Sequence, residues 1–115
     1  MALIAAQSPS IAAAAPVYSA VAASDTIDGT PGGRLLLHIK NGGASPDNVV
    51  IDDPNTILPP GGSLADTARD VAFTVTNAQE RMIVIDAARF TNPATGLITL
   101  THSFTTSVTI GVFRI

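Results

Sequence analysis

The sequence predicts an all-β protein: an antiparallel β-sandwich, jelly-roll-like or a small barrel, with an extended N-terminal arm. Three observations indicate this class. Short apolar segments alternate with polar residues at period two, turn signals separate them at intervals of roughly eight to twelve residues, and no strong helical period competes. We divide the chain into an arm over residues 1–23, part of which can form a strand, and a β-sandwich domain over residues 24–115.

A strand over residues 34–41 is expected at the centre of the core. Its length suits a strand, and glycine pairs stand on both sides of it at 32–33 and 42–43. Its expected neighbour is the C-terminal segment 107–115, in which apolar residues also recur at every second position. The inward side chains expected on these two strands are Leu35, Leu37, Ile39, Val108, Ile110 and Val112.

Four further strands are expected between these two. They cover residues 49–51, 71–76, 81–86 and 96–102. A hairpin is the simplest connection from the central strand to 49–51. The segment 81–86 is apolar on both faces, so we expect the arm or another subunit to cover one of them.

The segments between the strands carry turn residues. Residues 24–33 and 56–63 are expected to be loops because aspartate, glycine and proline dominate them. Residues 64–70 fit either one helical turn or irregular structure. Residues 87–93 are expected to form a corner in which Phe90 plugs one end of the core, since a lone aromatic side chain in a polar loop otherwise has no place to pack.

The composition points to a small core and to partners. Charged residues make up 13% of the chain, against about 25% in ordinary domains, while apolar residues make up 46% and aromatic residues 4%. Association with other copies would stabilise so thin a core. The net charge of -3 argues against a nucleic-acid partner, and no apolar run approaches the ~18 residues of a membrane span.

The N-terminal arm is rich in alanine and nearly uncharged, and two prolines exclude a long helix. It is too apolar for a solvated tail, so its side chains should lie against protein. Residues 17–22 fit a strand on the chain's own sandwich, whereas an arm docked on a neighbouring subunit is the alternative, and both can hold. The side chains expected to anchor the arm on another surface are Ile4, Ile11, Val17 and Tyr18.

The two histidines, His38 and His102, both fall on expected strands and lie outside any metal-binding spacing. They could approach each other across a sheet. We interpret each as a satisfied core or edge histidine, because that role is several-fold commoner for a lone strand histidine than metal ligation.

The carboxylates give no sign of a catalytic pair. Asp52 and Asp53 stand beside a proline in an expected turn, so they should face solvent, and Asp25 and Asp28 are interpreted as solvated turn residues rather than calcium ligands. The chain has no cysteine, no Gly-x-Ser-x-Gly elbow and no phosphate-binding glycine loop. The sequence therefore predicts no catalytic, metal or cofactor site, and a protein that is not an enzyme.

Several segments together resemble a known family. They are Pro-Val-Tyr-Ser-Ala at 16–20, Asp-Thr-Ile at 25–27, the central strand with its flanking glycines at 33–42, Arg-Met-Ile at 81–83, Arg-Phe-Thr-Asn-Pro-Ala-Thr-Gly-Leu at 89–97, and the C-terminal strand at 106–115. These segments look like those of small β-sandwich structural proteins of tailed bacteriophages, of the head decoration or cement type. Residues 46–78 match least. The chain departs from the family at His102, where a tyrosine is common, and at 84–86, where a Gly-Pro-Phe corner is common.

The resemblance implies a virion structural protein that binds the assembled head and stabilises it. Its partners would be the major capsid protein and other copies of itself, as a homotrimer at a symmetry axis, with the arm reaching the capsid subunits. It would be made in the host cytoplasm and lie on the capsid surface. Two alternatives stay open: a head–tail connector or tail protein, and a carbohydrate-binding sandwich. The second is disfavoured because the chain has no tryptophan and one tyrosine to stack on a sugar.

Overall fold

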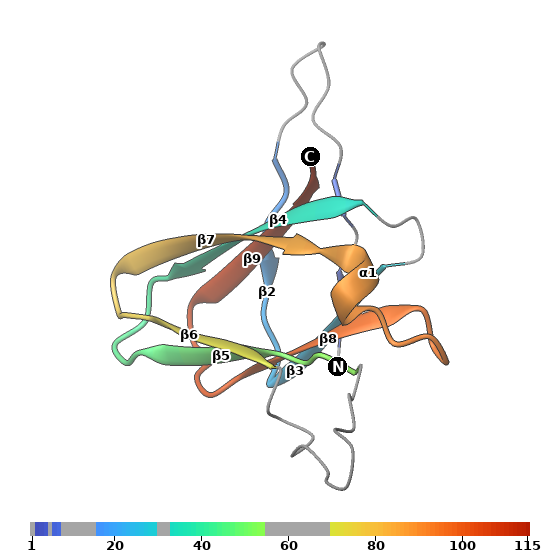
Figure 1. The fold of residues 1–115 in the computed structure, drawn as a ribbon. Coiled ribbons are helices and arrows are strands. Elements are labelled where there is room, and N and C mark those ends of the chain that lie inside the picture. The colour runs from blue at the N-terminus through green and yellow to red at the C-terminus, as the bar shows by residue number, and fades with distance from the viewer. Residues whose placement is uncertain (1, 5, 8–15, 30–32, 55–69) are drawn as a thin grey trace, which may run out of the picture.

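A computed structural model gives the fold of most of the chain (Figure 1). The residues that it describes are 2–4, 6–7, 16–29, 33–54 and 70–115. The expectations for Ile11, for the loop at 56–63 and for all but the last residue of 64–70 lie outside the described residues. No helix among the described residues is both long and apolar enough to cross a bilayer.

The described residues form nine strands and one short helix. These elements are β1 (Ala2–Ile4), β2 (Ser19–Ala20), β3 (Ser24–Asp28), β4 (Arg34–Asn41), β5 (Asp47–Ile51), β6 (Val71–Val75), β7 (Gln79–Asp86), α1 (Ala87–Phe90), β8 (Leu97–His102) and β9 (Val108–Arg114).

Two sheets pack face to face and make a sandwich, as the sequence predicts (Figure 1). One sheet has the order β1-β3-β8-β5-β6 and the other has the order β2-β9-β4-β7. Every pair is antiparallel except β1 and β3, which are parallel. From β2 to β9 this is the strand order of a jelly roll, in which strands that follow one another in sequence are mostly placed in opposite sheets.

The core forms around β4, which pairs with β7 on one side and with β9 on the other. Because side chains alternate along a strand, every second residue of β4 faces the other sheet. The six inward side chains predicted for β4 and β9 are all buried, which confirms the central pair; they are Leu35, Leu37, Ile39, Val108, Ile110 and Val112.

The expected hairpin between the central strand and the next strand is wrong. β5 lies in the opposite sheet, between β8 and β6, because both edges of β4 are already paired. The five-residue connection crosses between the sheets, and Asn41 fastens it: its side-chain amide donates to the carbonyls of Ser45 (2.8 Å) and Val75 (3.0 Å) and accepts from the amide of Gly43 (2.9 Å). The pairing of strands that are distant in sequence here outweighs the local preference for a hairpin.

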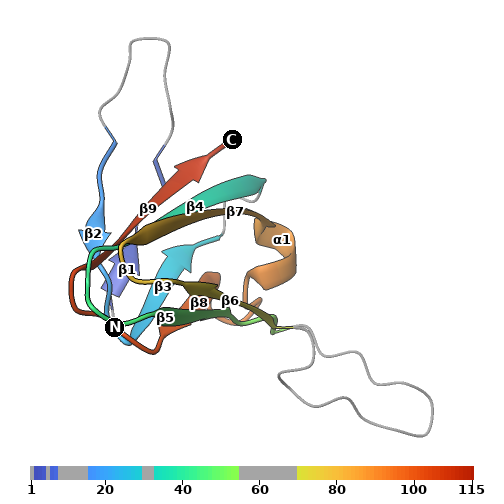
Figure 2. The ribbon, with the colours of Figure 1, turned by 90° about the vertical axis from the view of Figure 1, so that its left-hand side faces the viewer.

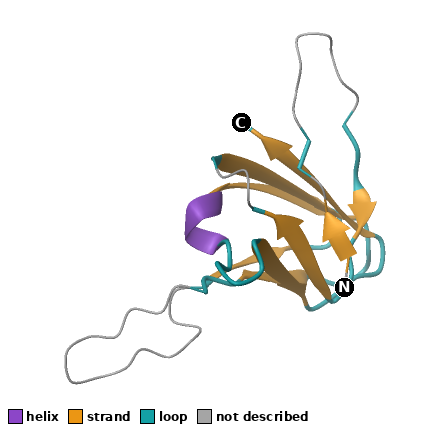
Figure 3. Ribbon diagram, turned by 90° about the vertical axis from the view of Figure 1, so that its right-hand side faces the viewer, coloured by secondary structure: helices purple, strands orange, loops and turns teal. Residues whose placement is uncertain are grey.

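The loop expected over residues 24–33 is also wrong in its first half. Residues 24–28 form β3, which lies between β1 and β8 and buries Asp25, Thr26 and Ile27. The corner after β7 begins with α1, whose N-cap is Asp86, and Phe90 is only 3% exposed. Phe90 therefore fills one end of the core as predicted, and Figure 3 shows the short helix that carries it beside the two sheets.

Candidate functional site

The described N-terminal residues, 2–4, 6–7 and 16–20, lie on the chain's own sandwich and join the two sheets at one edge (Figure 2). β1 extends the five-stranded sheet beside β3, and Gln7 then bridges to Phe113 of the other sheet. The amide of Gln7 donates to the carbonyl of Val112 (2.7 Å), and its carbonyl accepts from the amide of Arg114 (2.6 Å). β2 follows on the same side of β9, paired at Ser19 and Ala20.

A groove opens where these N-terminal pieces meet. Its volume is about 360 Å³, and it is lined by Leu3, Ile4, Gln7, Val17 and Ser19. The side-chain amide of Gln7 crosses it, donating to the carbonyl of Val17 and accepting from its amide, both at 2.6 Å. Leu3 is 66% exposed and Val17 is 62% exposed, so two large apolar side chains of this lining are open to solvent. We call these five residues the N-terminal groove.

The four predicted anchors do not form one patch. Ile4 is 5% exposed and belongs to the chain's own core, while Val17 is exposed in the N-terminal groove. Tyr18 is half-buried on the four-stranded sheet, and Ile11 lies outside the described residues. Sequence reasoning missed Leu3 and Gln7, although Gln7 is the first polar residue of the chain and so carried a signal.

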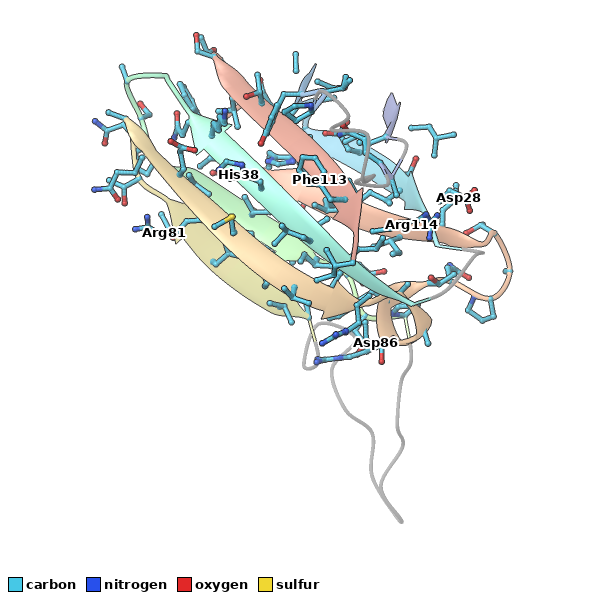
Figure 4. All side chains as sticks on the ribbon, turned by 90° about the horizontal axis from the view of Figure 1, so that it is seen from above. Asp28, His38, Arg81, Asp86, Phe113 and Arg114 are labelled. Carbon is cyan, nitrogen blue, oxygen red and sulfur yellow. The ribbon has the colours of Figure 1, made fainter. Side chains whose placement is uncertain are left out.

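Tyr18 is held on the outer face of the four-stranded sheet, the face turned away from the core. Its hydroxyl hydrogen-bonds Nδ1 of His38 at 2.7 Å, and its ring meets the ring of Phe113 edge-on with centroids 6.0 Å apart. Nζ of Lys40 lies 4.1 Å from the centroid of the tyrosine ring. Gly111 lies beneath this ring, because a Cβ at that position would come within 2.8 Å of it. Figure 4 looks onto this face and shows His38 and Phe113 on it.

His38 extends these contacts toward β7, at the other edge of the four-stranded sheet. Its Nε2 lies 2.7 Å from Oε1 of Glu80 on β7, so Tyr18, which directly precedes β2, is linked through His38 of β4 to β7. Beyond them, Met82 and Val84 of β7 are 67% and 50% exposed. The described part of the arm does not cover them, because β2 lies beside β9 at the opposite edge of the sheet.

His102 lies in the other sheet from His38, so the two histidines do not meet. Its Nδ1 lies 2.7 Å from Oδ2 of Asp47, while its Nε2 is 3.7 Å from Oδ2 of Asp25 and has no hydrogen-bond partner among the described residues. All three side chains are fully buried. The expectation of a solvated Asp25 is therefore wrong: its carboxylate is turned inward and accepts from the amide of Ala22.

Asp53 is another aspartate that was expected to face solvent and is buried instead. It is 1% exposed, and its Oδ2 accepts from Nε of Arg89 of α1 at 2.9 Å, so the expectation that it faces solvent is wrong. The physical reason is that the helix brings a cation to the carboxylate, which offsets the cost of burial. Among the described residues, no group of three or more His, Cys, Asp or Glu is arranged to hold a metal ion.

Comparisons with known proteins add no relative to this picture. No protein-family model matches the chain, and neither a curated protein nor a solved structure matches it.

Proposed function

We propose that this chain is a virion structural protein of a tailed bacteriophage, a decoration or cement protein that binds the assembled capsid and stabilises it. The jelly-roll strand order supports the proposal, because viral capsid domains are among the users of this fold. Lectin domains and cupins use it too, so the fold alone does not decide the function.

The observation that carries the proposal is the N-terminal groove. Leu3 and Val17 expose apolar surface in the segment through which the resemblance implies contact with capsid subunits. Gln7 fixes the separation of the groove's two sides through both of its bonds to Val17. A small apolar site of this kind binds weakly alone, but copies joined to one another on a repeating lattice gain affinity through avidity.

Co-sedimentation of the purified chain with capsids assembled without it tests the proposal. A decoration protein is expected to bind in numbers on the order of hundreds of copies per shell, whereas a connector or tail protein would bind as a ring of about six or twelve. Binding to no capsid would overturn the proposal, and ring stoichiometry would move the protein to the neck or tail.

Two substitutions locate the contact. Val17→Asp and Leu3→Asp each place a charge on an exposed side chain of the N-terminal groove, so we expect each to reduce the bound copies by about tenfold or more while leaving the fold intact. Ala72→Asp, on the exposed face of β6 in the distant part of the five-stranded sheet, is the matched control and should bind as the unmodified chain does. Equal binding by all three variants would exclude the groove as the contact.

A further inference from the structure

β7 is the edge strand of the four-stranded sheet, and its hydrogen-bonding pattern shows which backbone groups face outward. The amide of Ala87 donates to the carbonyl of Gly33 at 2.9 Å, in line with the register that pairs Arg34 with Asp86. Because an antiparallel ladder alternates, the odd-numbered residues of β7 bond to β4 and the even-numbered residues direct their N–H and C=O groups away from it. Met82 and Val84 are at the middle of this outward set.

The side chains of the same residues are also exposed. Met82 and Val84 point to the outer face, where they are 67% and 50% exposed. Proteins usually protect an edge strand with charge, and this edge has charge only toward its ends. Arg81 donates from its guanidinium to the carbonyl of Glu80 at 2.8 Å, which occupies one outward group, and Asp86 caps α1 at the other end (Figure 4). The apolar middle has no such protection among the described residues.

We propose that this edge binds the same edge of a second copy of the chain, antiparallel, with a two-fold axis at Ile83. In this register Met82 stands opposite the second copy's Val84, and each pair can exchange N–H···O=C bonds in both directions. Ile83, which is half-buried in one copy, would meet its own equivalent on the inner face. The two four-stranded sheets then become one continuous sheet.

The outward-facing residues of β7 select a second copy because their order, acidic, apolar, apolar and acidic at Glu80, Met82, Val84 and Asp86, is symmetric about Ile83. A shift of the axis to Met82 would set Glu80 against the second copy's Val84, and a shift to Val84 would set Met82 against the second copy's Asp86. Only the Ile83 register pairs both outward apolar residues, Met82 and Val84, with apolar residues, and such pairs are the main source of cross-strand stabilisation here.

The register also sets Glu80 opposite the second copy's Asp86 at each end. Each of these carboxylates has a basic residue of the neighbouring strand β4 as its cross-strand partner. Lys40 is the partner of Glu80, and Arg34 is the partner of Asp86. Glu80 is also held within its own copy by Nε2 of His38 at 2.7 Å, and both carboxylates are exposed, so repulsion between the copies at these positions is weak.

Sedimentation equilibrium of the full chain across a concentration series, without capsids, tests the proposal. The unmodified chain is expected to self-associate. Val84→Pro removes one outward N–H, a change that an edge strand tolerates, and should raise the dissociation constant by about tenfold or more. A chain that stays monomeric, or an association that Val84→Pro leaves unchanged, would overturn the proposal.

A matched proline control exists on the other sheet. Asp52 donates to Thr99 of β8, and so the even-numbered residues of β5 face β8 and its odd-numbered residues face β6. Ala72 is paired with Val50, and its N–H therefore points to the free edge of β6. Ala72→Pro repeats the chemistry at a different edge and should leave the association unchanged.

A side-chain variant keeps the test valid if the proline variant fails to fold. Val84→Lys leaves every backbone group in place and puts a charge at the proposed contact, so it should also weaken the association by about tenfold or more. Ala72→Lys, which places the same charge on the exposed face of β6 at an edge of the other sheet, should not. Amide hydrogen exchange adds a direct readout: the amides of Met82 and Val84 should be protected at high concentration and exchange fast on dilution, and fast exchange at every concentration would contradict the pairing. Because no capsid is present, this result is independent of the proposed function.

Discussion

At the scale of single residues, the described core holds a polar cluster that the sequence only half predicts. His102 was expected to be a satisfied core histidine, and it is buried with Asp47 at 2.7 Å. Its partners could not be predicted from the sequence. Asp47 lies 55 residues away along the chain, and the residues around Asp25 have the composition of a turn. Both carboxylates also accept backbone N–H bonds, Asp25 from Ala22 and Asp47 from Ser103, which compensates part of their desolvation.

Replacing His102 tests how much this cluster contributes. His102→Ala leaves two buried carboxylates without the imidazole between them, so we expect the free energy of unfolding to fall by about 3–5 kcal/mol. His38→Ala is the control, because His38 bonds Tyr18 and an exposed Glu80, and it should cost about 1 kcal/mol. Urea denaturation followed by circular dichroism measures both, and equal losses would contradict the assigned role of the buried cluster.

At the scale of elements, strands with regular alternation could be predicted and strands defined by distant partners could not. β4, β6, β8 and β9 follow the period-two pattern and lie within a residue or two of their expected positions. β3 was missed because turn-forming residues surround it, and its burial comes from β1 and β8 on its two sides. The groove was half predicted: Ile4 and Val17 line it, but its shape depends on Gln7, whose role appears only once β9 is beside it.

The parallel strand β1 gives a prediction at this scale. Ile4 is 5% exposed in the core and its neighbour Leu3 is 66% exposed, so one strand offers an inward and an outward apolar residue. We expect Ile4→Ala to lower the free energy of unfolding by about 2–5 kcal/mol, and Leu3→Ala to change it by less than about 0.5 kcal/mol. The same denaturation experiment compares them. A negligible cost for Ile4→Ala would show that β1 contributes little to the sandwich.

At the scale of the whole molecule, the jelly-roll topology makes the last strand, β9, necessary for the packing of strands from the first half of the chain. β9 lies between β2 and β4, and most contacts of the described residues join positions far apart in sequence. Such a topology cannot close until the C-terminal strand is present, and folds dominated by non-local strand pairs form in about milliseconds to seconds rather than microseconds.

Removing β9 should therefore prevent folding rather than merely weaken one edge. A chain ending at residue 107 loses Val108, Ile110 and Val112 from the core, and it exposes both β2 and the inner edge of β4. We expect this truncation to be digested rapidly by protease and to lack the circular dichroism of a folded sandwich. A chain lacking only Ile115, which is 57% exposed, is the control and should resist protease as the full chain does. Protease resistance of the chain without β9 would mean that the five-stranded sheet folds by itself, and the central strand β4 would not be the organising element of the molecule.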